Sequence, residues 1–203
     1  MTVVGLTGSS GSGKSTVSSL LRAEGFDIID CDRIARDVLR PDTACLAAIF
    51  CIFGSAVQNE DGSLNRRALA DIVFHDRQKL KQLNAVMYPQ IKTDINEILK
   101  QLAQSGTALV VLDAPTLFES GADQMCDVTV SVLSNDALRL KRIVSRDKID
   151  LELAQSRLAS QHSNSFYRDK SDYTIENSGS LEQLKQQVKT LAETLKNHHE
   201  QRA

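Results

Sequence analysis

The sequence lacks the cysteine pattern, the charge excess and the long apolar runs that mark several large protein classes. Its four cysteines show no C-x-x-C spacing and no companion histidine cluster, which argues against a zinc site or a disulfide framework. The 24 basic and 26 acidic residues leave a net charge of −2, so we expect neither nucleic acid nor a membrane surface as a partner. No apolar run approaches the roughly 18 residues of a membrane span. These absences predict a cytoplasmic protein.

Short apolar runs alternate with helical segments along the 203 residues. The runs lie at residues 2–7, 26–29, 108–112, 128–133 and 173–175. Continuous apolar strands separated by helices are typical of a parallel sheet covered on both faces. The sequence therefore predicts an α/β fold with a five-stranded parallel sheet, in one domain that carries a sub-domain.

The connection between the second and third runs is unusually long, at roughly 75 residues with mostly helical periodicity. Helices are predicted over residues 66–74 and 77–87, and Pro89 is expected to open a further helix that reaches Gln104. This connection leaves room for a helical sub-domain inserted into the sheet domain.

Apolar residues also recur at three- and four-residue spacing near the end of the chain. They are Leu181, Leu184, Val188, Leu191 and Leu195. A coiled-coil seam is one interpretation, but the pattern covers only about two heptads, fewer than a sustained coil needs. We therefore expect this helix to dock onto the sheet.

The first strand leads into a glycine-rich segment, residues 8–15, which matches G-x4-G-K-[ST]. In this motif the glycines let backbone N–H groups surround phosphates, the lysine adds positive charge and the final hydroxyl binds magnesium. Lys14 and Ser15 hold the last two positions, and the motif lies between a predicted strand and a predicted helix as its mechanism requires. A flexible Gly/Ser turn is the alternative, which this placement disfavours.

Asp113 closes the third apolar run and resembles a Walker B aspartate, which holds or orients magnesium beside a P-loop. Its alternative role is that of a turn former or helix N-cap ahead of Pro115. The two roles are compatible with each other.

Four classes of P-loop protein fit this motif: a small-molecule kinase, a GTPase switch, a mechanochemical ATPase and a nucleotide-sensing module without turnover. A Ras-type GTPase needs D-x-x-G after its third strand, but Thr116 stands at the glycine position, and residues 169–172 only approach the later N/T-K-x-D motif. A motor ATPase normally needs a longer chain. A helical insertion is suited to binding an acceptor substrate, so the sequence favours a kinase.

Two carboxylates end the second strand, at Asp30 and Asp32. Side chains alternate along a strand, so both point to one side if the extended conformation persists. A carboxylate at this edge of the sheet can accept the proton of an acceptor hydroxyl, and Asp32 is the candidate base. The alternative is that both acids cap the helix that follows.

Arginines follow the fourth strand at positions 139, 142 and 146, which form one stripe on a helix. Arginine binds phosphate oxygens with a planar fork and neutralises charge in the transition state. Arg157 and Gln161 lie four residues apart on the next predicted helix, so the segment has the pattern of a helical lid. A solvated helix face is the alternative.

Together these features resemble the dephospho-CoA kinase family over almost the whole chain. The resemblance rests on separated motifs, namely residues 5–8, 11–16, 30–32, 34–36, 61–66 with Leu69, 83–84, Pro89, 112–115, 117–119, Arg142, 146–147, Arg157, Gln161, 172–173, Ile175, Asn177 and Gly179. Such a set is far more specific than the P-loop alone.

The resemblance implies transfer of phosphate from Mg²⁺-bound ATP to the 3′-hydroxyl of dephospho-CoA, the last step of coenzyme A synthesis. We expect a monomer or weak homo-oligomer. It implies four catalytic residues, Asp32 as base with Lys14, Arg142 and Arg146. For ATP it implies Gly11, Ser12, Gly13, Lys14, Ser15, Thr16 and Asn177; for the metal, Ser15 and Asp113; and for the acceptor, Asp32, Arg36 and Asn84. The implied segments are a P-loop kinase core (1–40, 106–138 and 171–203), an acceptor-binding insertion (41–105) and a lid (139–170).

The sequence departs from the usual family pattern at several positions. Tyr88 replaces a histidine, Ser9 and Ser10 replace Gly-Ile, and Tyr167 stands where a lysine is usual. The serines remove no phosphate contact, and Arg168 or Lys170 can replace the missing lysine charge. We therefore assign no lid lysine.

Overall fold

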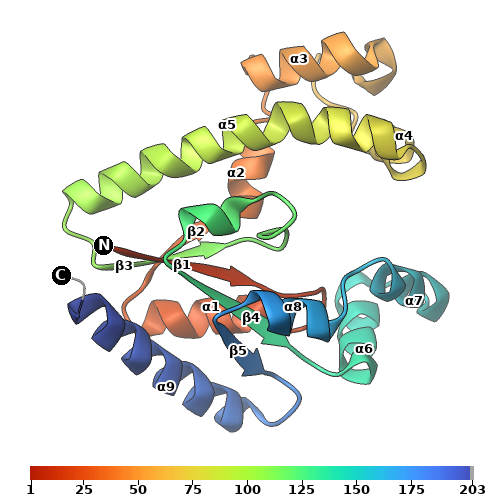
Figure 1. Ribbon diagram of the computed structural model, residues 1–203. Coiled ribbons are helices and arrows are strands. Elements are labelled where there is room, and N and C mark those ends of the chain that lie inside the picture. Colours follow the sequence, from red (N-terminus) through yellow and green to blue (C-terminus); the bar gives the residue numbers. More distant parts are fainter. Residues whose placement is uncertain (202–203) are drawn as a thin grey trace. The chain divides into compact units, whose positions relative to one another are not determined.

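The computed structural model describes residues 1–201, and its centre is a five-stranded sheet in the order β2-β3-β1-β4-β5 (Figure 1). The strands are β1 (Thr2–Thr7), β2 (Asp27–Asp30), β3 (Leu109–Asp113), β4 (Val128–Leu133) and β5 (Tyr173–Glu176). β1 pairs in parallel with β3 and with β4, and β4 pairs in parallel with β5. The five predicted strands and the α/β class are confirmed.

The chain forms two compact units, one of residues 30–102 and one of residues 1–29 together with the chain from Ala103 onward. The helices of the sheet unit are α1 (Lys14–Ala23), η2 (Ala122–Met125), α6 (Asp136–Asp147), α7 (Leu151–Ala159), α8 (Asn164–Lys170) and α9 (Leu181–Glu200). Those of the inserted unit are α2 (Cys31–Asp37), α3 (Ala44–Phe53), η1 (Ser55–Val57), α4 (Arg66–His75) and α5 (Arg77–Gln104), whose last turn crosses into the sheet unit.

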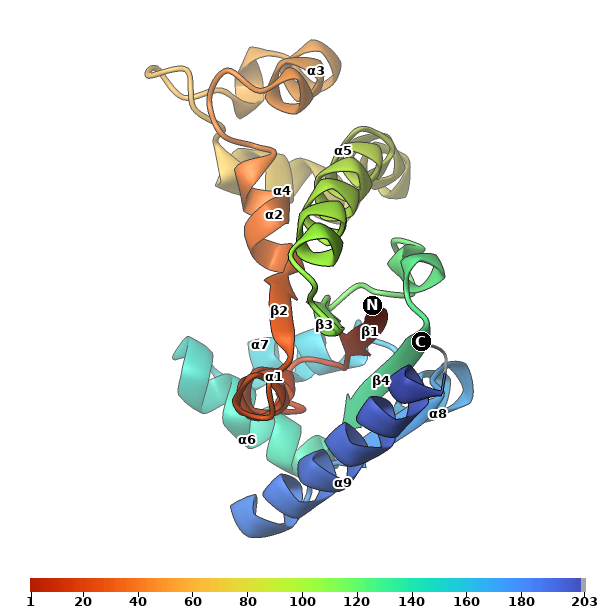
Figure 2. The same cartoon turned by 90° about the vertical axis from the view of Figure 1, so that its left-hand side faces the viewer.

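The core of the sheet unit lies between the central strands and the pair α1 and α9, which run side by side (Figures 1 and 2). Valines and leucines of β1 and β4 meet one face of each helix, and Leu6, Val130, Val17 and Leu195 are fully buried. β1 is buried along its whole length because it is the middle strand. This rigid centre positions the loop that follows β1.

The C-terminal helix docks onto this core, as its apolar spacing predicts. Leu184, Val188, Leu191 and Leu195 are all buried, and Leu181 alone among the predicted apolar positions is exposed, at 55%. The helix begins at a capping box, in which the Ser180 hydroxyl accepts the Gln183 N–H and the Gln183 amide oxygen accepts the Ser180 N–H.

The inserted unit is helical, but one predicted boundary within it is wrong. Residues 77–104 form a single helix with Pro89 inside it, where two helices were expected. Proline removes one hydrogen bond of the helix but does not end it here, because Leu83 on one side and Ile95 and Leu99 on the other are buried along the same element. The unit observed begins at residue 30, whereas the acceptor-binding segment, 41–105, stays a prediction about function.

Within residues 1–201 no helix is long and apolar enough to cross a membrane.

Two leucines of α9 provide a matched test of this packing. We expect Leu195→Ala to lower the free energy of unfolding by about 2–5 kcal/mol, because it removes most of a fully buried side chain and leaves a cavity. Leu181→Ala changes an exposed side chain of the same helix and should stay within about 0.5 kcal/mol of the original protein. Urea denaturation measures both, and equal effects would contradict the docked helix.

Candidate active site

The glycine-rich loop connects β1 to α1 and has a backbone that only glycine adopts readily. Gly8, Gly11 and Gly13 have φ values of 150°, 76° and 96°. Gly13 is the N-cap of α1 and has no side chain to satisfy the first N–H groups of that helix. Open N–H groups at a helix N-terminus, carrying the positive end of its dipole, form an anion site.

The loop also passes too close to its neighbours for side chains at these glycines. A Cβ at Gly8 would lie 2.5 Å from the carbonyl oxygen of Val132, and one at Gly11 would lie 2.7 Å from that of Arg139. A Cβ at Gly13 would overlap the side-chain amide of Asn177. The motif glycines are therefore required by packing as well as by backbone conformation.

Lys14 and Asp113, which were predicted to act on phosphate and on magnesium respectively, form an ion pair in which the ammonium donates to Oδ1 of the carboxylate. Their side chains are only 16% and 15% exposed. Asp113 reaches this position because it ends β3 beside β1, in register with Leu6. Ser15 and Thr16 are exposed in the first turn of α1.

Asp113 and Ser15 supply the carboxylate and hydroxyl oxygens that Mg²⁺ accepts as ligands. Among residues 1–201 no group of three or more His, Cys, Asp or Glu side chains forms a cage for a metal. The donor set therefore fits an ion held mainly by phosphates and water, which is the usual arrangement of magnesium at nucleotide sites.

Arg142 and Asn177 bind the carbonyl side of the loop. Nη1 of Arg142 donates to the carbonyl oxygens of Gly11 and Ser12 at 3.1 and 3.3 Å, and the Asn177 amide donates to the Ser12 carbonyl at 2.7 Å. Nη2 of Arg142 donates to the Asn177 carbonyl at 3.1 Å, so α6 is hydrogen-bonded to the segment that follows β5. These bonds use carbonyl oxygens of the loop and none of its N–H groups, so they support the loop without occupying donors for an anion.

Arg146 lies on the rim of the same loop. It donates to both carboxylate oxygens of Asp147, at 2.7 and 3.0 Å, and to the Ser10 hydroxyl at 3.1 Å. Arg157 reaches Asp147 at 2.8 Å from α7. The hydrogen bond from Arg146 holds the pKa of Asp147 below its usual value, and the same bond raises the pKa of Arg146. Both groups therefore stay charged near neutral pH.

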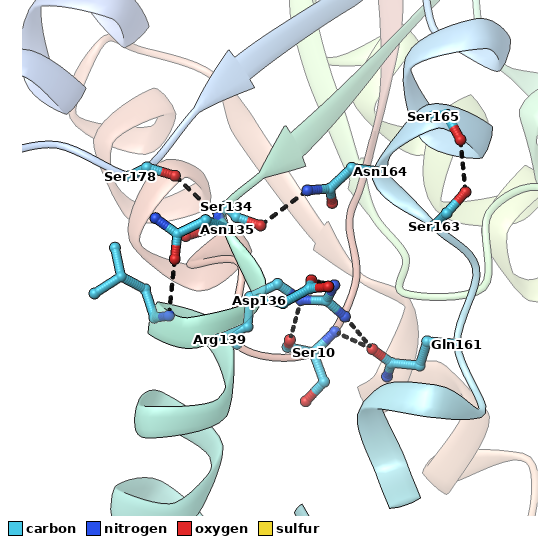
Figure 3. A network of polar contacts seen from close by, with 12 residues as sticks. Ser10, Ser134, Asn135, Asp136, Arg139, Gln161, Ser163, Asn164, Ser165 and Ser178 are labelled. Atoms are coloured by element: carbon cyan, nitrogen blue, oxygen red, sulfur yellow. Dashed lines mark hydrogen bonds and ion pairs between the residues drawn. The ribbon is translucent and has the colours of Figure 1, made fainter. Parts of the chain in front are cut away.

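Arg139 differs from the other two members of the predicted arginine stripe. Only 2% of it is exposed, and its guanidinium contacts Ser10, Asp136 and Gln161 (Figure 3). The three arginines therefore approach one loop from different depths and do not form a single solvated face.

Tyr167, which stands where the family pattern has a lysine, is buried. Its pKa rises to about 12, chiefly because of burial and then because of the negative charge of Glu119.

The predicted acceptor residues belong to the inserted unit, and their local geometry corrects one expectation. β2 ends at Asp30 and α2 begins at Cys31, so strand alternation does not place the carboxylates of Asp30 and Asp32 on one side. Asp30 is the N-cap and accepts the Arg33 N–H at 2.9 Å, while Asp32 lies exposed in the first helical turn. The capping alternative thus holds for Asp30. Arg36 lies one turn further along α2, and Asn84 lies on α5.

Sequence reasoning missed Ser134, the buried residue that follows β4 directly. Its hydroxyl donates to the Asn177 carbonyl at 2.9 Å and accepts from Arg142 at 3.2 Å. Its carbonyl accepts from Asn164 of α8 at 2.9 Å. The available signal was its position, a polar residue directly after the carboxyl end of a predicted strand, where ligands of open α/β sheets gather.

Two glycines with similar φ provide a test of the loop. Gly13 and Gly25 have φ values of 96° and 93°, but a Cβ at Gly25 meets nothing within 4 Å. We expect Gly13→Ala to lower the free energy of unfolding by about 1–3 kcal/mol more than Gly25→Ala, because only the first forces the Asn177 side chain aside. Urea denaturation measures the difference, and equal losses would mean that Asn177 does not pack against Gly13.

Comparison with known proteins places this site in a family. The family profile of dephospho-CoA kinases matches residues 2–183. A dephospho-CoA kinase from Fusobacterium nucleatum is 39% identical over 95% of this chain and 98% of its own length. A crystal structure of a Thermus thermophilus protein matches with a TM-score of 0.83 at 34% identity, covering 96% of this chain and 97% of that one. A dephospho-CoA kinase from Campylobacter jejuni matches with a TM-score of 0.70 at 30% identity, covering 95% and 96% of the two chains. With its P-loop, its Lys14–Asp113 pair and matches that extend over nearly the whole chain, this protein belongs to the dephospho-CoA kinase family.

Proposed function

We propose that the chain transfers the terminal phosphoryl group of ATP to the 3′-hydroxyl of dephospho-CoA, which yields coenzyme A and ADP. The observation that carries this proposal is the family match over residues 2–183 of a chain whose phosphate loop is formed. The chain is a P-loop kinase of a family whose activity is ATP-dependent and belongs to coenzyme A biosynthesis. The cytoplasm suits this reaction and the four free cysteines.

The sheet unit would bind the donor. The segment Gly11 to Thr16 would hold the phosphates through those of its backbone N–H groups that are not bonded within the chain, since the Ser12 and Thr16 N–H groups already donate to the Ser9 and Gly13 carbonyls. Lys14 would add the nearest positive charge, and the Asn177 amide donates to the Ser12 carbonyl. Arg142 and Arg146 approach the loop from α6 and would offset negative charge that spreads over the transferred group. Positioning and charge balance are the main contributions that a protein makes to phosphoryl transfer.

Magnesium bound with ATP would neutralise part of the phosphate charge, and Ser15 and Asp113 are the residues that would hold the ion. Lys14 and Asp113 neutralise each other in this structure. When the donor binds, Lys14 exchanges the carboxylate for phosphate oxygens, and the Asp113 carboxylate becomes available as a ligand. The ion pair thus keeps two buried, opposite charges satisfied until ATP provides a partner for each.

The inserted unit would bind the acceptor through Asp32, Arg36 and Asn84. Asp32 would accept the proton of the 3′-hydroxyl while that oxygen forms its bond to the γ-phosphorus and the bond to ADP breaks. The segment α6–α8 would form the lid. We expect small-molecule substrates only, without nucleic acid or membrane, and a monomer or weak homo-oligomer.

The direct test is a coupled assay of ADP release with Mg-ATP and a panel of alcohol acceptors. Dephospho-CoA should be preferred to nucleosides and other small alcohols by orders of magnitude. Preference for another acceptor would indicate a different small-molecule kinase on this scaffold. ATP binding without ADP release for any acceptor would indicate a nucleotide-sensing module.

Asp32→Asn tests the proposed base. We expect turnover of dephospho-CoA to fall by about 10²–10⁴-fold with ATP affinity unchanged, because the amide cannot accept the hydroxyl proton. Steady-state kinetics and calorimetric titration with Mg-ATP measure the two effects. Asp30→Asn is the control: it removes the neighbouring charge but keeps an oxygen for the N-cap of α2, and it should retain turnover. Full activity of Asp32→Asn would remove Asp32 from the mechanism.

Lys14→Ala tests the donor site. Loss of a charge-assisted contact to phosphate costs about 1.5–3 kcal/mol, so the affinity for Mg-ATP should fall roughly tenfold to a hundredfold. Calorimetric titration measures this affinity. Lys141→Ala removes an exposed lysine of α6 and should bind Mg-ATP normally; an equal loss in both variants would show that only the overall charge matters.

A further inference from the structure

Three side chains from outside the loop hold Ser10, through its N–H, its carbonyl and its hydroxyl. Figure 3 shows two of them, Gln161 and Arg139. The Ser10 N–H donates to Oε1 of Gln161 at 2.9 Å, and its carbonyl accepts from Nε of Arg139 at 3.2 Å. Nη2 of Arg146 donates to its hydroxyl at 3.1 Å. Because the Ser10 N–H is already bound, it is not directed at phosphate, and the anion site starts further along the loop.

Arg139 is nearly inaccessible, yet its guanidinium has a partner on every nitrogen. Nε binds the Ser10 carbonyl, Nη1 binds Asp136 at 2.8 Å and Nη2 binds Gln161 at 2.9 Å. A buried cation is costly unless it is paired and fully hydrogen-bonded, and these partners satisfy that condition. Arg139 is therefore engaged by the protein itself and is not a free cation for triphosphate.

Gln161 is the junction between Arg139 and the loop. Its single oxygen, Oε1, accepts from the Ser10 N–H and from Nη2 of Arg139, both at 2.9 Å. Gln161 follows α7 in the proposed lid segment and lies 151 positions from Ser10 in the sequence. Its hydrogen bond to Ser10 therefore connects the lid segment to the phosphate loop. A side chain of the same size without an acceptor would leave the buried cation and the backbone N–H each short of a partner.

We infer that Arg139 and Gln161 are positioning residues, a bracket that closes on the Ser10 peptide and keeps the phosphate loop in its ATP-binding conformation. The inference rests on the proposed function, in which neither side chain touches the reacting atoms. A glycine-rich loop has many accessible conformations, and apparent affinity falls in proportion to the binding-competent fraction. The bracket raises that fraction before ATP arrives. Once ATP is bound, its phosphates hold the loop, so the bracket acts on donor affinity and not on the chemical step.

Three substitutions test the bracket. Gln161→Met keeps the length of the side chain but removes the acceptor, and Gln161→Glu keeps an oxygen for both donors. Gln187→Met is the matched control, because Gln187 also makes two side-chain hydrogen bonds, to the Glu176 N–H and carbonyl, and neither bond involves a residue of the loop. Each variant is characterised by thermal melting, calorimetric titration with Mg-ATP and steady-state kinetics with dephospho-CoA.

We expect Gln161→Met to weaken Mg-ATP binding and raise the KM for ATP by about tenfold, with kcat and the KM for dephospho-CoA unchanged. Gln161→Glu should retain the ATP affinity of the unmodified protein, and Gln187→Met should also bind ATP normally. A general loss of stability would lower the melting temperature without this selective effect on ATP.

Normal ATP binding by Gln161→Met, equal defects in the Met and Glu variants, or a loss in Gln187→Met as large as that in Gln161→Met would each overturn the bracket. If the unmodified chain binds ATP but does not phosphorylate dephospho-CoA, the proposed function fails, while the calorimetric comparison still decides for or against the bracket.

Discussion

The candidate site depends on the hydrogen bonds that hold the carbonyl oxygens of the phosphate loop. Ordering a chain segment costs about 1–2 kcal/mol per residue, and glycine loses the most freedom. Arg142 and Asn177 offset this cost by donating hydrogen bonds to the carbonyl oxygens of Gly11 and Ser12. These bonds use no N–H group of the loop, so they support the loop without occupying donors for an anion.

The charges of the site are balanced within a short distance. Lys14 pairs with Asp113, Arg139 with Asp136, and Arg146 with Asp147. Arg139 is engaged by the protein itself, so three cations, Lys14, Arg142 and Arg146, remain around one loop in a chain whose net charge is −2. This arrangement explains how a protein without an excess of positive charge can bind a highly charged anion, since only local charges act strongly at close range.

The acceptor side shows how local structure changes the meaning of a motif. Asp30 and Asp32 look equivalent in the sequence, but the strand ends between them and their environments then differ. Asp30 caps α2, and Asp32 lies exposed in the first turn of that helix. The cap gives Asp30 a structural role, and the exposed Asp32 is the proposed base.

The sequence by itself determined the α/β class, the five strands, the phosphate loop and the docked C-terminal helix, because these follow from local spacing of glycines and apolar residues. It also predicted that Asp113 holds or orients magnesium beside the P-loop, but its ion pair with Lys14 came from the tertiary structure. It could not determine that α5 continues through Pro89, because burial on both sides of a proline is a property of the packed chain. Only the tertiary structure decided the different depths of Arg139, Arg142 and Arg146, the role of Ser134 and the joining of Gln161 to Ser10. Those contacts join residues far apart in the chain, and helical spacing shows which side chains share a face but not what the face meets.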